Sequence, residues 1–375
     1  MSGVKSSLFV VLLLVITTAQ ATPTRVIAFG DSLSDRGNLL MDSIALGPPF
    51  PPVPPPGLYL DGRFTNGPIW LEYLAGALGG QPLGDVDPSQ SFGSDAALKS
   101  ALLDPSTSIS FAYGGSGSFD ALNVTPDGNF LVPGLLRQVR DFAALLGTDA
   151  APDDALYAVW GGANDYLFDV DLTAPPAAIA AQIGALVPQV IGNISVSIGE
   201  LYAMGARKFI VPNLPVLSSV PLLGDYASLL MLSPGDVAQL QALLDQLALA
   251  HNAGLQMALD GLALLPGIEI IELDVFALSG QALATLDTSA GPAAGCLFST
   301  GALPVGDPAL CLGNTLGVDT TGRYFYDELH PTAQVHALLG QAAIAAVPVP
   351  PVTLLMLVGA ALVLRNRHKR CVTAA

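Results

Sequence analysis

The chain runs Val26-Ile27-Ala28-Phe29-Gly30-Asp31-Ser32-Leu33-Ser34-Asp35 near its start, and this stretch decides much of the fold. Four apolar residues followed by a glycine and an aspartate are typical of a buried strand that ends in a tight turn. The turn places Ser32 where its hydroxyl can be exposed. A serine hydroxyl is a weak nucleophile until a neighbouring base accepts its proton. The stretch therefore predicts a strand and a candidate nucleophile together.

Strand-like and helix-like segments alternate along the rest of the chain. We expect four further strands, which cover residues 109–113, 155–160, 208–211 and 268–273. Apolar residues at helical spacing predict helices over residues 69–78, 135–146, 179–204, 237–264, 274–283 and 332–346. This order predicts a three-layer α/β/α sandwich with a central, mainly parallel five-stranded sheet of the flavodoxin-like kind. Polar clusters follow several strands, at the edge where such sheets build their sites.

The composition favours a single well-packed domain. Of the 375 residues, 51% are hydrophobic and only 12% are charged, which supports a large core and argues against disorder. Residues 48–57 hold seven prolines and predict a stiff extended loop. Residues 80–108 and 287–322 are rich in small and polar residues and are expected to form long loops. No segment divides the core, so we expect one domain over residues 22–346.

Residues 1–21 are predicted to be a signal peptide. Lys5 supplies a basic start, an apolar run extends from Leu8 to Ile16, and Ala19-Gln20-Ala21 fits a cleavage site for signal peptidase. The apolar run is short for a membrane span. The alternatives are an uncleaved anchor and a buried first strand.

Residues 347–375 are predicted to form a second targeting signal. Val347-Pro348-Val349-Pro350-Pro351 precedes an apolar run over residues 352–364, and four basic residues follow that run. The basic end is expected to stay cytoplasmic while the tail is inserted in the membrane. The order resembles the PEP-CTERM sorting tails of exported bacterial proteins, which an exosortase-type protease removes. That resemblance implies a bacterial envelope or extracellular protein with a transient membrane anchor, and an ordinary tail anchor is the alternative.

The charge of the predicted domain excludes one class of partner. Without the two targeting segments, nine basic residues stand against 31 acidic ones, for a net charge of about −22. Such a surface repels polyanions, so nucleic-acid binding is excluded. Cys296 and Cys311 lie in one Gly-rich loop, where an oxidising compartment favours a disulfide between them; two unpaired small side chains are the alternative.

His330 is the best candidate for the base. Of the four histidines, His368 lies in the tail, while His251 and His336 lie within predicted helices. His330 lies at a loop-to-helix junction, and Asp327 precedes it by three residues. At that spacing the carboxylate can hold the imidazole in the tautomer that presents its other nitrogen to a serine. A structural helix cap is the alternative for His330.

Two further clusters can bind a developing oxyanion. Gly114-Gly115 offers a backbone N–H after one strand, and Asn164 offers an amide side chain after the next. The N–H of Ser32 is a third candidate donor. Each cluster also has a plain structural explanation, as a turn or a helix cap.

These motifs resemble the blocks of the GDSL, or SGNH, serine hydrolases. The first block corresponds to Gly30-Asp31-Ser32-Leu33, the second to residues 110–115, the third to residues 162–165 and the last to Asp327 and His330. Residues 62–68 also resemble a stretch of the lipase and lecithinase branch. One departure is Ser110, which replaces the asparagine that usually opens the second block and leaves Gly114 open as the donor.

The resemblance implies catalytic roles for Ser32, His330 and Asp327, and oxyanion donors at Ser32, Gly115 and Asn164. It implies an exported enzyme that cleaves carboxylic esters of lipids, lysophospholipids or short acyl chains through an acyl-enzyme, with no metal or organic cofactor. The G-x-S-x-G elbow of ordinary α/β-hydrolases is absent from the sequence. The alternatives are a deacetylase of exported polysaccharide and a non-catalytic binding module on the same fold.

Overall fold

The computed structural model describes residues 22–125, 128–171, 174–294 and 316–347. The predicted signal peptide, the predicted sorting tail beyond Val347, and the cysteines Cys296 and Cys311 lie outside these residues.

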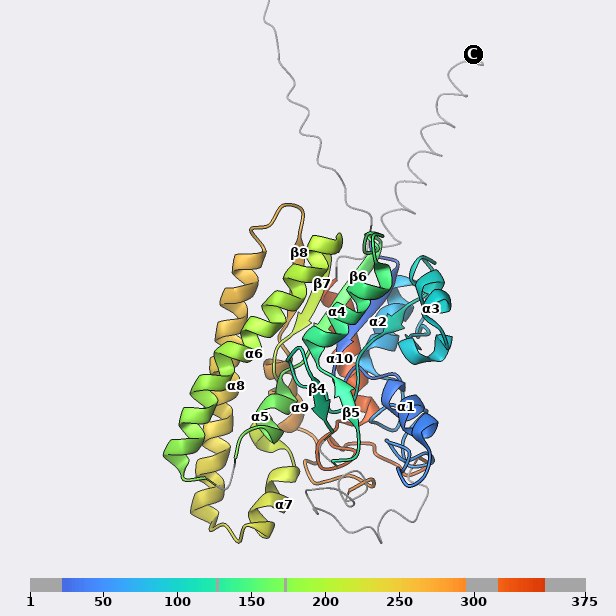
Figure 1. The fold of residues 1–375 in the computed structure, drawn as a ribbon. Coiled ribbons are helices and arrows are strands. Elements are labelled where there is room, and N and C mark those ends of the chain that lie inside the picture. Colours follow the sequence, from blue (N-terminus) through green and yellow to red (C-terminus); the bar gives the residue numbers. More distant parts are fainter. Residues whose placement is uncertain (1–21, 126–127, 172–173, 295–315, 348–375) are drawn as a thin grey trace, which may run out of the picture.

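A parallel sheet lies at the centre of the fold (Figure 1). Its strands follow the order β2-β3-β1-β6-β7-β8, and each neighbouring pair is parallel. Their bounds are β1 (Arg25–Gly30), β2 (Asp87–Pro88), β3 (Ile109–Ser110), β6 (Ala155–Trp160), β7 (Lys208–Pro212) and β8 (Glu269–Leu273). The central strands β1, β6 and β7 are buried along their whole length, as expected for strands covered on both faces.

Helices cover both faces of this sheet (Figure 1). Alternate residues of β1 enter two separate cores, because successive side chains of a strand point to opposite faces. Ile27 and Phe29 pack in the core beneath α4, α6 and α8, whereas Val26 and Ala28 pack in the core beneath α2 and α10. The helices are α1 (Asn38–Leu46), α2 (Trp70–Leu78), α3 (Asp95–Leu102), α4 (Leu135–Leu146), α5 (Ala163–Phe168), α6 (Pro176–Met204), α7 (Leu222–Leu229), α8 (Pro234–Leu262), α9 (Val275–Leu283) and α10 (Ala333–Ala346).

The three-layer α/β/α architecture is confirmed, with six strands in the sheet where five were predicted. The sixth is β2, a two-residue edge strand that contains Pro88 and lies within the predicted loop over residues 80–108. That segment also contains α3, which begins at the cap residue Ser94. The short helices α1, α5 and α7 and the antiparallel hairpin of β4 (Leu122–Val124) and β5 (Leu131–Pro133) were likewise not predicted. Helix α5 and the two hairpin strands, of six and three residues, are too short to show a periodic apolar pattern.

Strand β1 lies between β3 and β6, so the chain leaves the first strand at the point where strand order reverses. Ligand sites of open parallel sheets form at such a point, beyond the carboxyl ends of the strands. In the described part of the chain, α6 alone is long and apolar enough over Ala177–Met204 to cross a membrane, with a mean hydropathy of 1.5. This helix packs against α4 and α8.

Candidate active site

Ser32, His330 and Asp327 form one continuous hydrogen-bonded chain. The Oγ atom of Ser32 lies 2.8 Å from Nε2 of His330, and Nδ1 of His330 lies 2.8 Å from Oδ2 of Asp327. All three residues are buried. The structure therefore brings together the three residues for which the sequence predicted a shared site, although almost three hundred positions separate Ser32 from the other two.

Asp327 is held as a carboxylate by its own loop. Its Oδ1 accepts hydrogen bonds from the backbone N–H groups of Leu329 (2.7 Å) and His330 (2.6 Å). Burial favours the neutral acid, but the charge of His330 and these hydrogen bonds outweigh it and keep the pKa of Asp327 below its usual value. An ionised Asp327 can stabilise an imidazolium at His330 and fix the Nδ1–H tautomer.

The turn that carries Ser32 is fixed by close contacts at Gly30. A Cβ atom at this position would lie 2.1 Å from the carbonyl oxygen of Trp160 on the adjacent strand β6, so only glycine fits. Gln138 of α4 accepts a hydrogen bond from the N–H of Gly30 (2.9 Å) and donates one to its carbonyl oxygen (2.8 Å). Sequence reasoning did not identify Gln138, since a glutamine on an amphipathic helix carries no signal of such a contact.

Asp31 lies beside the serine in an apolar environment. Its Oδ1 accepts a hydrogen bond from the N–H of Leu33 at 3.0 Å. Burial raises the pKa of Asp31 to about 7, with the Leu33 hydrogen bond and the charge of His330 acting in the opposite direction. The carboxyl group thus lines the site without belonging to the Ser32–His330–Asp327 chain.

The backbone geometry favours Gly115 over Gly114 as an oxyanion donor. The N–H of Gly114 donates to Oδ2 of Asp35 at 2.8 Å, and that carboxylate also accepts from backbone N–H groups at the start of α1. The N–H groups of Gly115 and Ser32 make no hydrogen bond within the described residues. Gly115 has a φ of 80°, a left-handed conformation that glycine adopts readily.

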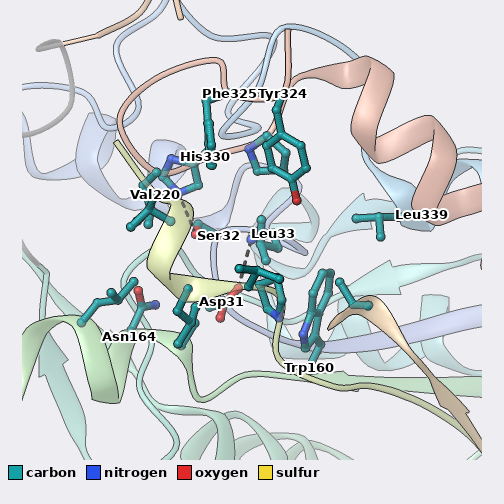
Figure 2. A pocket seen from close by; sticks show the side chains of 18 residues that line it. Asp31, Ser32, Leu33, Trp160, Asn164, Val220, Tyr324, Phe325, His330 and Leu339 are labelled. Atoms are coloured by element: carbon teal, nitrogen blue, oxygen red, sulfur yellow. Dashed lines mark hydrogen bonds between the residues drawn. The ribbon is translucent and has the colours of Figure 1, made fainter. Parts of the chain in front are cut away.

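Asn164 lies with Ser32 in the wall of one cavity (Figure 2). Its Nδ2 donates to the carbonyl oxygen of Ser116 at 2.9 Å, which fixes the amide and leaves its second N–H for a ligand. The next residue, Asp165, accepts from both the N–H and the hydroxyl of Ser118. These contacts tie the third motif to the segment that follows the second.

Ser110, the departure from the family pattern, has a structural role of its own. Its hydroxyl donates to the carbonyl oxygen of Ser34 at 2.7 Å and accepts from the N–H of Ala112 at 3.2 Å. Asn38 of α1 donates to the carbonyl oxygens of Ser110 and Ala112, each at 2.9 Å. The segments after β1 and β3 are therefore joined without an asparagine at position 110.

A small cavity of about 60 Å³ opens beside Ser32 (Figure 2). Apart from Asp31, Ser32, Asn164 and His330, its walls are almost entirely apolar. Figure 2 shows Val220 on the side of Asn164, and Trp160, Tyr324 and Leu339 on the opposite side of Ser32. The other lining residues are Leu33, Ala163, Leu167, Pro215, Val216, Leu217, Val275, Phe325, Leu329 and Pro331.

The two other histidines of the described chain, His251 and His336, are buried within helices. His336 is buried in α10, and burial lowers its pKa to about 3. His251 of α8 is also buried, lies 2.8 Å from the hydroxyl of Tyr166, and has a pKa lowered to about 4 by burial. Neither residue contacts Ser32 through a hydrogen bond in the described chain. The described residues also contain no group of three or more His, Cys, Asp or Glu side chains placed to hold a metal ion.

The fold and this geometry define a class of protein: a three-layer α/β/α domain with a buried hydroxyl–imidazole–carboxylate chain at the carboxyl ends of its parallel strands. A family profile described as GDSL-like lipase/acylhydrolase matches residues 26–343. The chain therefore belongs to the GDSL-like lipase/acylhydrolase family, as its motifs predicted.

Several relatives are similar over about half of the chain or more. A GDSL esterase/lipase of Arabidopsis thaliana is 31% identical over 211 residues, which are 53% of this chain and 52% of the relative. Another from the same plant is 29% identical over 273 residues, with 67% and 65% covered. A phosphatidylcholine-sterol acyltransferase of Aeromonas hydrophila is 28% identical over 219 residues, with 57% and 52% covered. The chain thus spans about half the length of the first of these relatives.

Among solved structures, the chain is similar to a member of the lipolytic G-D-S-L family from Veillonella parvula. The sequence identity is 12% and the TM-score is 0.36, over 86% of this chain and 96% of the other.

Proposed function

We propose that this protein is an exported serine hydrolase that cleaves carboxylic esters through an acyl-enzyme. The observation that carries the proposal is the unbroken chain from Ser32 through His330 to Asp327, with both hydrogen bonds at 2.8 Å. Membership of the GDSL-like lipase/acylhydrolase family supports the same reaction. A binding module that had lost catalysis would not need to keep this buried polar chain, because polar groups are costly to bury.

In the proposed reaction, His330 Nε2 accepts the proton of Ser32 as Oγ attacks the ester carbonyl. Asp327 stabilises the resulting imidazolium. The tetrahedral oxyanion accepts hydrogen bonds from the N–H groups of Ser32 and Gly115 and from the Asn164 amide. Collapse breaks the bond to the alcohol, which leaves with the proton from His330, and the acyl group stays on Ser32. Water then attacks in the same way, and the carboxylic acid is released with Ser32 restored.

The cavity favours an ester with a short acyl chain. A cavity needs roughly 10–15 Å³ to hold one water molecule. The cavity of about 60 Å³ therefore holds only a few non-hydrogen atoms. The walls are mostly apolar and suit a hydrocarbon chain, whereas a sugar would find few polar side chains there besides Asp31, Asn164 and Tyr324. We therefore place esters of roughly four to six acyl carbons first, on the basis of this volume. The name of the Aeromonas relative makes phospholipid esters the next class to test.

Hydrolysis of p-nitrophenyl butyrate by the purified domain tests the proposal. Ser32→Ala should abolish turnover and labelling by a fluorophosphonate probe while thermal unfolding stays close to that of the wild type. Ser34→Ala is the matched control, because its hydroxyl lies on the same segment and accepts a hydrogen bond from Trp70 rather than contacting His330. Undiminished ester hydrolysis by Ser32→Ala would reject the assignment.

The targeting segments complete the proposal. Residues 1–21 would direct export and be removed by signal peptidase, and residues 347–375 would anchor the protein until an exosortase-type protease cuts near Val347-Pro348. Expression of the full chain in a bacterium with and without an exosortase, followed by intact-mass measurement, tests both cuts. A mature mass that still includes the basic tail in the presence of the protease would contradict the sorting part only.

A further inference from the structure

The Asp327 carboxylate has a second side-chain partner besides His330. The hydroxyl of Tyr59 lies 2.7 Å from Oδ2 of Asp327, the same oxygen that contacts Nδ1 of His330 at 2.8 Å. Tyr59 is 1% exposed and lies directly after the proline-rich loop, far from the four catalytic motifs in the sequence. Burial and the neighbouring Asp327 hold the pKa of Tyr59 well above its usual value. The phenol therefore stays protonated and donates to the carboxylate.

The position of this hydroxyl is fixed by the surrounding segment. The ring of Tyr59 packs edge-on against Tyr326, with ring centroids 5.4 Å apart, and the hydroxyl of Tyr326 donates to the carbonyl oxygen of Leu58. Five residues further on, the ring of Phe64 lies 5.0 Å from the imidazole of His330. One short stretch of chain thus contacts both the acid and the base.

The same stretch also holds the backbone that follows the base. The hydroxyl of Thr65 donates to the carbonyl oxygen of Pro331 at 2.9 Å, and Asn66 accepts from the N–H of Ala333 at 2.9 Å. A Cβ atom at Gly67 would lie 2.5 Å from Cβ of Ala333, which shows how closely the two segments approach. Residues 59–67 thus contact the Asp327–His330 loop along its length, and Tyr59 is the residue among them that contacts Asp327.

We propose that Tyr59 is a positioning residue of the hydrolase, whose hydroxyl orients Asp327 and shares its Oδ2 with His330. This inference rests on the proposed function. The donated hydrogen bond has two consequences: it fixes the carboxylate in the plane that the imidazole requires, and it draws negative charge away from the oxygen that stabilises the imidazolium. The chain of hydrogen bonds therefore extends over four residues, from Tyr59 to Ser32.

Other ionisable groups surround this hydrogen-bonded chain and are not altered when Tyr59 is changed. Asp31 and His336 of α10 interact electrostatically with His330, and Glu328 interacts with Asp327 and Tyr59. The wild type and Tyr59→Phe differ by one hydroxyl group only, so their comparison separates the effect of Tyr59 from the effects of these other groups.

Tyr59→Phe is the test, with kcat and KM measured against pH on p-nitrophenyl butyrate. We expect kcat to fall roughly tenfold with KM nearly unchanged, because Asp327 loses the hydrogen bond that orients its carboxylate toward the imidazole, and this loss outweighs the gain in negative charge. We also expect the midpoint of the acidic limb of the profile to rise by roughly half a pH unit, since Asp327 then stabilises the imidazolium more strongly. Tyr157→Phe is the control, because its buried hydroxyl donates to the Pro152 carbonyl oxygen at 2.8 Å, before β6 begins.

A purely structural role for Tyr59 predicts a different result. In that case Tyr59→Phe would match Tyr157→Phe, with an acidic limb at the wild-type position, and the inference would be wrong. If part of the Tyr59→Phe protein is unfolded, titration of active sites with a fluorophosphonate counts the folded enzyme, and kcat per titrated site is compared with that of Tyr157→Phe. The double variant is a second test: in an Asp327→Ala background, removal of the Tyr59 hydroxyl should have no further effect on kcat. An equal loss in both backgrounds would also overturn the proposal.

The role of Tyr59 can be rejected while the proposed function still stands. An active wild type and an inactive Ser32→Ala, together with a Tyr59→Phe that behaves like its control, reject only the role of Tyr59. An inactive wild type that a fluorophosphonate does not label rejects the proposed function first.

Discussion

The length of acyl chain that the protein accepts should depend on one wall of the cavity beside Ser32. Leu339 of α10 is 5% exposed and lines this cavity of about 60 Å³. The same residue lines a second, larger cavity of about 260 Å³ between α9 and α10. Tyr324 also lines both cavities, so these two side chains separate them. Leu339→Ala should join the two spaces.

The size of the effect follows from the groups removed. Replacing leucine by alanine deletes three carbon atoms, so an acyl chain can extend by about three methylene groups into apolar surroundings. At about 0.8 kcal/mol for each buried methylene, the gain approaches 2.4 kcal/mol, or a change of roughly ten- to sixtyfold in kcat/KM for heptanoate relative to butyrate esters. The variant should also lose about 2–5 kcal/mol of stability, as buried Leu→Ala changes do.

The assay is a series of p-nitrophenyl esters from acetate to decanoate, measured as kcat/KM for each length. Leu338→Ala is the control, because Leu338 is 43% exposed and lines only the larger cavity. Its chain-length profile should match that of the wild type. A Leu339→Ala profile that also matches the wild type, in a protein shown to be folded, would refute the idea that this wall limits the acyl chain.

Three further predictions follow from single residues. Asn164→Ala should lower kcat by about a hundred- to a thousandfold with little change in KM, since one oxyanion donor is lost; a loss below about threefold would remove Asn164 from that role. The pKa of Asp31 is about 7 in the folded protein against 3.8 when unperturbed, so the folded state binds more protons between these pH values. The stability of Asp31→Asn relative to the wild type, measured by urea unfolding, should therefore increase as the pH rises from 4 to 7, and a flat difference would contradict this. Gly30→Ala places a Cβ atom 2.1 Å from the Trp160 carbonyl oxygen, so it should lower the melting temperature and the activity together; a variant with wild-type values would disprove that close approach.

The sequence predicted the long elements well and grouped the three residues that the structure joins by hydrogen bonds, because both leave local signals. The strand that ends at Gly30 and the helix over Leu135–Leu146 follow from apolar periodicity. Ser32, Asp327 and His330 could be grouped by chemistry, as only one histidine had a carboxylate at a suitable spacing outside a helix. Gly115 and Asn164 remain predicted oxyanion donors. Gly114 is the weaker candidate, because its N–H already donates a hydrogen bond to Asp35.

What the sequence could not predict depends on contacts between distant segments. Gln138 holds both backbone groups of Gly30 across 108 positions, and the Tyr59 hydroxyl reaches Asp327 across 268. Nothing in the local sequence of either residue distinguishes these contacts from a surface glutamine or an ordinary core tyrosine. The short strand β2 and helix α5 were missed for another reason: tertiary pairing, rather than local preference, fixes elements of a few residues.

Detection of the acyl-enzyme is the most direct test of the proposed mechanism, because the intermediate forms only if the nucleophile, the base and the pocket act together. The purified domain would be mixed with p-nitrophenyl butyrate, quenched in acid within the first turnover, digested and analysed by peptide mass spectrometry. We expect one butyryl group on the peptide that contains Ser32, at that residue, and none in a His330→Ala variant. An active wild type with no acyl group on Ser32, or with the group on another residue, would contradict the central claim.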